Sequence, residues 1–152
     1  AKNNKDVLFY ETVLPSAKGF WQTKMECLPI RASKNDAPMV FRTEMMEQAE
    51  EWGTNNKLLK TSATKPLTRT VPPSFPYFYI EFGENHQGYA MILENTNFPK
   101  HFGLDTICGM LRMEPMKFRS KNNNHTQDDE RQLIQDFLKS WKSVDWTQNM
   151  DG

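Results

Sequence analysis

Polar side chains alternate along the stretch FWQTKMECLP, residues 20–29, which predicts a strand that ends at a proline. An extended chain places Gln22, Lys24 and Glu26 on one side and the intervening residues on the other. Three hydrogen-bonding groups in this arrangement could form a catalytic surface, or simply the solvent-facing side of a sheet. The spacing alone leaves both interpretations open.

Basic residues gather in a second segment, which could contact nucleic acid. Lys117, Arg119 and Lys121 are spaced by two in MKFRSKN. On an extended segment these cations share one side, which suits them to following a phosphate backbone. A solvated loop after Pro115 is the alternative. The residues that we take as candidate RNA contacts are Lys24, Lys100, His101, Arg112, Lys117, Arg119 and Lys121.

Aromatic side chains offer a third possibility. Alternation in YFYIEF, residues 77–82, places Tyr77, Tyr79 and Glu81 on one side of a predicted strand. The two tyrosines could stack on bases, as sheet aromatics do in some RNA-binding modules, or pack beneath a helix or against the first unit of the chain. Because Glu81 would repel a nearby phosphate, we favour packing.

Metal and disulfide chemistry is not expected. His86, His101 and His125 lie in separate loop-like stretches, whereas a metal site needs ligands that converge. Cys27 and Cys108 both lie in apolar contexts, so we expect both of them to be core residues. We also expect the protein to lie in a reduced, intracellular compartment. We expect no cofactor.

The first half of the chain predicts a strand pair and a helix. Residues 7–13, VLFYETV, are rich in β-branched and aromatic side chains and pair most economically with residues 20–29 as an antiparallel hairpin. Asp36 is a candidate N-cap, with proline in the first turn of a helix that ends near Gly53. The polar stretch that ends in RTVPPSFP predicts a linker.

The second half predicts another hairpin and two helices. Residues 77–82 and 89–94 form the hairpin, and a short helix covers residues 105–113 before Pro115. The sequence TQDD at 126–129 has the form of a capping box with Asp in place of Glu. The helix after it carries Leu133, Phe137 and Trp141 at spacing four, which is typical of a core-facing side.

Composition allows a packed fold and gives no global argument for nucleic acid. The chain has 152 residues, 38% of them hydrophobic, and a formal net charge of zero. Residues 98–121 are nevertheless locally basic, and a local patch can bind phosphate in a neutral protein. No apolar run approaches the roughly 18 residues of a membrane span, so we expect no membrane. We also expect the chain to begin inside a larger protein.

The stretch NFPKHFGLDTICGMLRMEPMKFR, residues 97–119, resembles the second C-terminal domain of the CwfJ family of splicing factors. A Phe-Pro, a Phe-Gly, a Gly-Met-Leu and a Glu-Pro follow at the family's intervals. VPPSFPYFYIEFG resembles the family's proline-led strand, and WKSVDWT its closing segment. Upstream, MECLPI and EEWGTNNKL are similar to the end of the family's first domain, which is related to histidine-triad proteins.

The resemblance places Gln22, Lys24 and Glu26 where histidine-triad enzymes carry three histidines. In those enzymes the middle histidine attacks a nucleotide phosphate, which requires a neutral imidazole near pH 7. A lysine amine has an ordinary pKa of about 10.4, and a carboxylate would repel the phosphate. The family often has a histidine at the position of Met91 and a basic residue at that of Leu104. We therefore expect no enzymatic activity.

The resemblance implies a nuclear, non-catalytic module of a pre-mRNA splicing factor that binds RNA and spliceosomal proteins. It also implies a role in the late, intron-lariat spliceosome and a link to lariat turnover. The RNA would be a small nuclear RNA or the lariat, and the rest of the polypeptide N-terminal to residue 1 would be a further partner. Two other functions stay open: a cryptic histidine-triad-type nucleotidyl hydrolase or transferase, and a scaffold that binds only proteins.

We expect an α+β fold of two small sheet-plus-helix units that pack together. By resemblance, residues 1–60 are the C-terminal part of a histidine-triad-like domain, incomplete at its N-terminus. Residues 61–73 are a linker, and residues 74–152 are the second C-terminal domain. If the first unit is incomplete, its strand at residues 7–13 exposes an edge.

Overall fold

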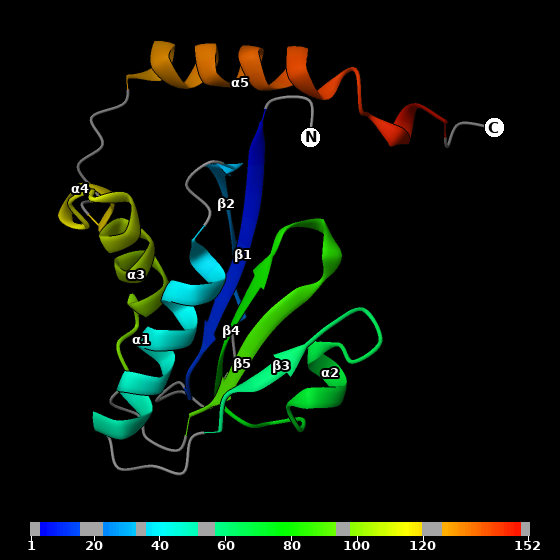
Figure 1. Ribbon diagram of the computed structural model, residues 1–152. Helices are drawn as coiled ribbons and strands as arrows, with labels where there is room; N and C mark the ends of the chain where they lie inside the picture. The colour runs from blue at the N-terminus through cyan, green and yellow to red at the C-terminus, as the bar shows by residue number, and fades with distance from the viewer. Residues whose placement is uncertain are drawn as a thin grey trace. The chain divides into compact units, whose positions relative to one another are not determined.

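Five strands form one antiparallel sheet in the computed structural model (Figure 1), which describes residues 4–15, 23–32, 36–51, 57–93, 98–119 and 126–149. The strands are β1 (Lys5–Val13), β2 (Met25–Arg31), β3 (Leu59–Thr61), β4 (Tyr77–Phe82) and β5 (Gln87–Ile92). They lie in the order β2-β1-β4-β5-β3, and every neighbouring pair is antiparallel. Strands β2 and β3 are therefore the two edges of the sheet.

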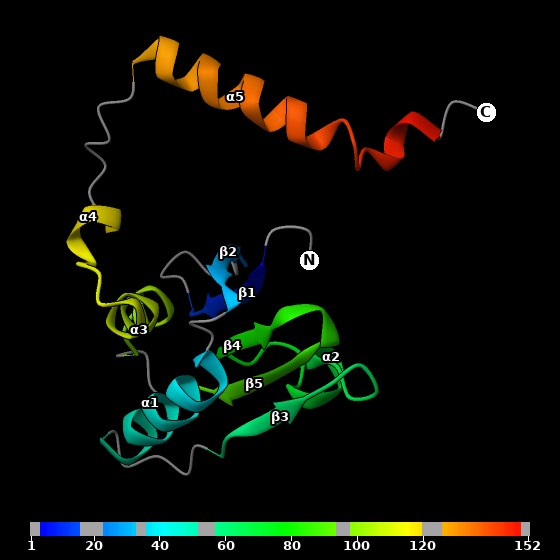
Figure 2. The ribbon, with the colours of Figure 1, turned by 45° about the horizontal axis from the view of Figure 1, so that its top comes forward.

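Helices cover both faces of this sheet. The helices α1 (Ala37–Glu51) and α3 (Phe102–Leu111) lie side by side on one face (Figures 1 and 2). The four-residue α2 (Leu67–Thr70) lies against the other face, and a 3₁₀ turn, η2 (Gly83–Asn85), connects β4 to β5. The sheet is thus the middle of three layers.

Aromatic rings join the two large helices to the sheet. The ring centroid of Phe41 in α1 lies 6.1 Å from that of Phe78 in β4 and 6.2 Å from that of Phe102 in α3. The rings of Phe78 and Phe102 meet edge-on at 4.9 Å. All three side chains are buried. Because each ring removes a large apolar area from water, this cluster fixes both helices on the central strands.

The opposite face of β4 is buried beneath α2. Tyr79 packs with Val71 and Ala90, and Leu67 of α2 and the half-buried Tyr77 pack against the same cluster. The prediction that the tyrosines of β4 pack beneath a helix is therefore confirmed.

A glycine brings α3 close to the sheet. A Cβ atom at Gly103 would lie 2.4 Å from Cδ2 of Tyr10 in β1, closer than any side chain tolerates. At its other end, α3 stops where Arg112 adopts a left-handed φ of 54°. The backbone N–H of Met113 then donates to the carbonyl of Cys108 at 2.8 Å, which closes the last turn. The helix therefore begins and ends earlier than the predicted range of 105–113.

The predicted α+β class is confirmed, and both predicted hairpins form, β1 with β2 and β4 with β5. The strands do not form two sheets, however, because β1 also pairs with β4. The expectation of an exposed edge at residues 7–13 is wrong, since β1 is an interior strand. The last residue of β3 and all of α2 lie within the predicted linker, 61–73. The division into family domains, 1–60 and 74–152, and the histidine-triad relation stay predictions.

Strand β2 continues beyond its predicted end at Pro29, which pairs with Val7. A proline is tolerated there because an edge strand leaves one row of backbone groups unpaired. Cys27 is exposed on this strand, whereas Cys108 in α3 is buried. The expectation that both cysteines are core residues is therefore wrong for Cys27.

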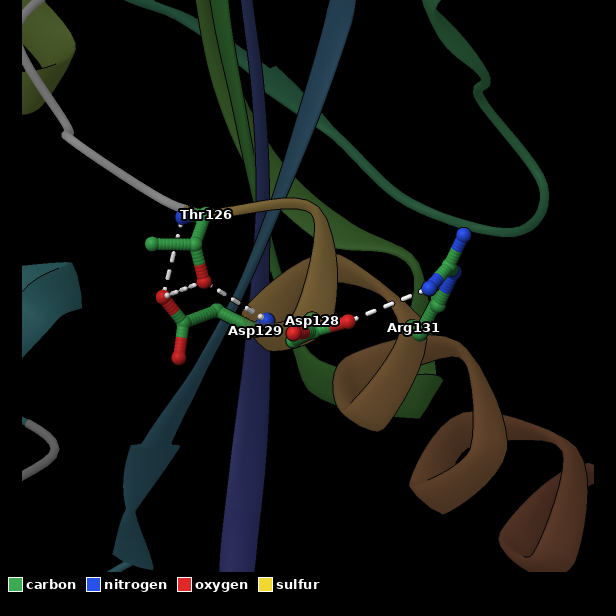
Figure 3. A network of polar contacts seen from close by, with 4 residues as sticks. All are labelled: Thr126, Asp128, Asp129 and Arg131. Atoms are coloured by element: carbon green, nitrogen blue, oxygen red, sulfur yellow. Dashed lines mark hydrogen bonds and ion pairs between the residues drawn. The ribbon is translucent and has the colours of Figure 1, made fainter.

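The chain divides into two compact units, residues 1–115 and 116–152. The second contains α4 (Met116–Arg119), α5 (Gln127–Trp141) and a 3₁₀ turn, η3 (Trp146–Asn149). Figure 3 shows the predicted capping box at the start of α5, which is confirmed. The N–H of Asp129 donates to Oγ1 of Thr126 at 3.2 Å, and the N–H of Thr126 donates to Oδ2 of Asp129 at 2.9 Å. In the next turn Arg131 donates to Asp128 at 3.1 Å (Figure 3).

The apolar side of α5 is exposed. Leu133 and Phe137 are 58% and 62% exposed, so the expectation that this side faces a core is wrong for the described residues. The second unit has too little chain to enclose such a side by itself. No helix in the described ranges combines the length and the apolar character needed to cross a membrane.

Candidate functional site

The predicted polar surface of β2 is an ion pair at a sheet edge. Glu26 lies opposite Tyr10 of β1 in the register, on the face covered by α1 and α3. The Nζ of Lys24, which precedes the strand, forms an ion pair with Oε1 of Glu26. The hydroxyl of Tyr10 donates to the same carboxylate. Gln22 lies outside the described residues, so two members of the predicted trio can be placed.

The pKa values of Glu26 and Tyr10 show which chemistry this ion pair allows. Burial raises the pKa of Glu26, but hydrogen bonds from Lys24 and Tyr10 and the charge of nearby His101 outweigh it, so the pKa is lowered overall. Burial and the hydrogen bond to Glu26 raise the pKa of Tyr10. A carboxylate that already accepts from an ammonium and a phenol is poorly placed to take a proton from a substrate. The geometry therefore suits charge neutralisation at the sheet edge.

Two further tyrosines bind carboxylates on the other face. Tyr77 donates to Oε1 of Glu11 at 2.5 Å, and Glu11 is only 6% exposed. Tyr79 donates to Oε2 of Glu81 at 2.6 Å, and Nδ1 of His86 lies 2.9 Å from Oε1 of the same residue. Burial, followed by these carboxylates, raises the pKa of both tyrosines. Each buried acid thus has a hydrogen-bond donor, as a stable interior requires.

The structure brings some of the predicted RNA contacts together and separates others. His101, at the start of α3, lies close enough to Glu26 to influence its pKa, and Lys100 is its neighbour in the chain. Lys24 therefore shares a region with both. Arg112 lies at the opposite end of α3, about 15 Å away along the helix axis. These cations do not form one cluster.

The remaining predicted cations belong to the second unit. Lys117 and Arg119 lie in the helical turn α4, where residues two apart are separated by about 200° around the axis. The expectation that they share one side of an extended segment is therefore wrong for these two residues. Their side chains, and the whole of Lys121, lie outside the described part of the structure.

No metal centre is present among the described residues, where no three His, Cys, Asp or Glu side chains come together. His86 follows η2, and His101 precedes α3. His125 lies outside the described ranges.

A basic hollow that the sequence reasoning missed lies beside β3. It has a volume of about 760 Å³ and lies between the start of α1, the edge strand β3 and the adjoining ends of β4 and β5. Three lysines line it: Lys57, Lys60 and Lys65. The signal was available, since three lysines and three hydroxyl residues fall within residues 57–65, but it lay in a stretch whose sequence showed little periodicity.

A family of known proteins matches the part of the chain that contains most of the residues lining this hollow. Residues 51–147 match the family model described as "Protein similar to CwfJ C-terminus 2". This range begins at the last residue of α1 and extends through β3, β4, β5 and the later helices.

Curated relatives match almost the whole chain. CWF19-like protein 2 of Homo sapiens is 36% identical over 146 residues, which are 95% of this chain and 16% of the relative. The CWF19-like protein 2 homolog of Caenorhabditis elegans is 29% identical over 149 residues, 97% of this chain and 31% of the relative. The CWF19-like protein 2 homolog of Drosophila melanogaster is 29% identical over 151 residues, which are 98% of this chain and 21% of the relative. The chain thus spans less than a third of each of these proteins.

Proposed function

Because the chain belongs to the family of proteins similar to CwfJ C-terminus 2, we propose that it is a non-catalytic module of a pre-mRNA splicing factor that binds RNA and proteins. The splicing role follows the resemblance to the CwfJ family described above. We further propose that the module acts in the nucleus, in the late spliceosome that holds the intron lariat, with a link to lariat turnover. Its partners are spliceosomal proteins and RNA.

The pairing of Lys24 with Glu26 is the observation that best supports a non-catalytic module. By the family resemblance, these residues stand where a histidine-triad enzyme needs an imidazole nucleophile and its neighbour. An amine held against a carboxylate would have to leave its partner and lose a proton before it could attack. The residue types and their pairing therefore favour binding over phosphoryl chemistry.

RNA contact is supported by exposed cations on the first unit. Lys100, His101 and Arg112 are exposed, and Lys24 is 79% exposed despite its ion pair. Exposed lysine and arginine side chains can neutralise phosphates without a large desolvation cost. The specific contacts, including those of Lys117, Arg119 and Lys121, stay predictions.

A second candidate function, a scaffold that binds only proteins, is favoured by the exposed side of α5. Phe137 and Trp141 stack with centroids 5.9 Å apart, and the adjacent Leu138 is 55% exposed. Exposed apolar side chains on one helix side are typical of protein interaction surfaces. The module can use such a surface for proteins and its cations for RNA.

The test of the non-catalytic assignment is incubation of the chain with a fluorogenic adenosine phosphoramidate, followed by intact mass measurement. We expect no turnover and no added mass. Turnover that disappears in Lys24→Ala, or a nucleotide attached to residues 22–26, would contradict the proposal and favour the cryptic hydrolase or transferase. A histidine-triad enzyme run in parallel controls for substrate quality.

A further inference from the structure

We propose that the hollow beside β3 is a binding site for single-stranded RNA, in which lysines contact phosphates and Tyr89 stacks on a base. This inference rests on the RNA-binding part of the proposed function and assigns it to a surface away from the sheet edge formed by β2. The hollow, about 760 Å³, falls within the range of about 300–1,000 Å³ that is typical of ligand sites.

The charge of the hollow is one-sided. Lys57, Lys60 and Lys65 line it, and none of the described residues that line it is acidic. All three lysines are exposed, and none forms an ion pair with a carboxylate in the described ranges. Unpaired cations around a concave surface raise the local concentration of anions. An RNA backbone supplies the complementary charge.

Two of the three lysines lie on an ordered backbone: Lys60 in the paired strand β3, and Lys65 in a turn closed by two backbone hydrogen bonds. The N–H of Ser62 donates to the carbonyl of Lys65 at 3.0 Å, and the N–H of Lys65 donates to the carbonyl of Ser62 at 3.0 Å. The Lys65 N–H also lies 3.2 Å from Oγ of Ser62, which is 3.1 Å from Oγ1 of Thr64. Because the backbone is already ordered, binding here costs less conformational entropy than binding to a free loop.

Aromatic rings give the hollow a second means of recognising nucleotides. Phe82 and Tyr89 line it, with ring centroids 5.3 Å apart at an angle of 72°. Tyr89 is half-buried and also lines a neighbouring hollow of about 510 Å³, together with Pro38 and Arg42. That neighbouring hollow is lined by Glu47 as well as Arg42, so the one-sided charge belongs to the larger hollow. There a base can stack on the accessible part of Tyr89, beside the lysines. This combination of rings and cations favours RNA over a purely anionic ligand.

The lysines are not explained by protection of a sheet edge alone. Edge strands often carry lysine to prevent pairing with another chain, and Lys60 in β3 fits that role. Lys57 precedes the strand and Lys65 follows the turn, so neither needs to protect it. Their placement around one concave surface is what an RNA site requires.

The test is fluorescence anisotropy of a labelled ten-nucleotide single-stranded RNA, titrated with the complete chain over a series of salt concentrations. Lys57→Gln, Lys60→Gln and Lys65→Gln are introduced together. The matched control, Lys5→Gln, Arg31→Gln and Lys142→Gln, removes the same charge at exposed positions that are not candidate RNA contacts. A further triple variant, Lys24→Gln, Lys100→Gln and Arg112→Gln, removes it from the earlier candidates. Circular dichroism checks that each variant is folded.

We expect the triple variant of the hollow to bind at least 10-fold more weakly, with a salt slope smaller by about 2, because three phosphate contacts are lost. The matched control should stay within about twofold of the unmodified chain. Tyr89→Leu should weaken binding about 10-fold and leave the salt slope unchanged, whereas Phe75→Leu should have no effect.

Other outcomes separate this inference from the proposed function. If the triple variant of Lys24, Lys100 and Arg112 loses affinity and the hollow variant does not, RNA binds at the earlier candidates and only this inference is overturned. If the unmodified chain binds no RNA at low salt, RNA binding itself fails and the inference with it. If adenosine monophosphate or polyglutamate displaces the RNA as well as unlabelled RNA does, the hollow is a small-nucleotide or acidic-peptide site, which overturns the assignment.

Discussion

Gly103 shows how one residue sets the distance between α3 and the sheet. Its position leaves no room for a Cβ atom, because Cδ2 and Cε2 of Tyr10 would lie 2.4 and 2.6 Å away. The Tyr10 ring cannot easily move, since its face is buried and its hydroxyl binds Glu26. The Phe-Gly pair of the family motif therefore has a packing role.

We expect Gly103→Ala to lower the free energy of unfolding by about 1–3 kcal/mol, as overpacking of a core does. Urea denaturation measures the change. Gly109→Ala is a matched control in the same helix, where an added Cβ meets nothing within 4 Å. It should stabilise the chain by up to about 1 kcal/mol, since alanine favours the helix. Equal effects of the two substitutions would contradict the packing role.

Sequence patterns predicted the roles of some residues and missed the contacts of others. The chemistry of Lys24 and Glu26 followed from their types and spacing, and their ion pair agrees with it. The contact between Gly103 and Tyr10 could not be predicted, because it depends on how a helix crosses a strand more than 90 residues away in the chain. The same holds for the proximity of His101 to Glu26.

Tyrosine–carboxylate hydrogen bonds, two of them between strands and one within β4, make the stability of the sheet depend on pH. Tyr10, Tyr77 and Tyr79 have pKa values raised by burial, and then by Glu26, Glu11 and Glu81 respectively. A pKa raised in the folded state stabilises the fold below the ordinary tyrosine value of about 10. That contribution is lost as the pH rises above it.

We therefore expect the free energy of unfolding to fall as the pH rises above about 10. Tyrosinate absorbance at 295 nm should appear at higher pH in the folded chain than in the urea-unfolded chain. Tyr77→Phe removes one of the three phenols and should reduce the pH dependence. Identical titration curves for folded and unfolded chains would show that the carboxylate contacts do not form.

Elements with a strong local pattern were predicted and those that depend on distant partners were not. Both hairpins and the capping box at Thr126 follow from alternation and from end-cap chemistry. Strand β3 has only three residues and forms because Leu59, Lys60 and Thr61 pair with β5. Its sequence has no strand pattern of its own, so the lysines and hydroxyl residues at 57–65 could be seen in the sequence but not assigned to the wall of a hollow.

At the scale of the whole molecule, one sheet crosses the boundary that the sequence suggested. Strand β1, in the first predicted unit, pairs with β4 of the second along six residues. Phe41 of α1 contacts rings from β4 and α3, so one core serves both predicted units. Periodicity identified each strand but could not show which strands pair.

We accordingly expect residues of the sheet and of both covering helices to unfold in one transition. Phe41→Ala should lower the free energy of unfolding by about 3–5 kcal/mol, because it leaves a large cavity at the centre of the core. Phe75→Ala, at a ring that is 49% exposed, should change it by less than about 0.5 kcal/mol. Two separate transitions, only one of them shifted by Phe41→Ala, would contradict a shared core.

Our central proposal is that this module binds RNA without cutting it. The most direct measurement titrates a labelled single-stranded RNA with the chain and then recovers the RNA on a denaturing gel. We expect saturable binding that weakens with salt, and recovery of the RNA at full length. Absence of binding at low salt, or shortened RNA that requires Lys24, would contradict the claim.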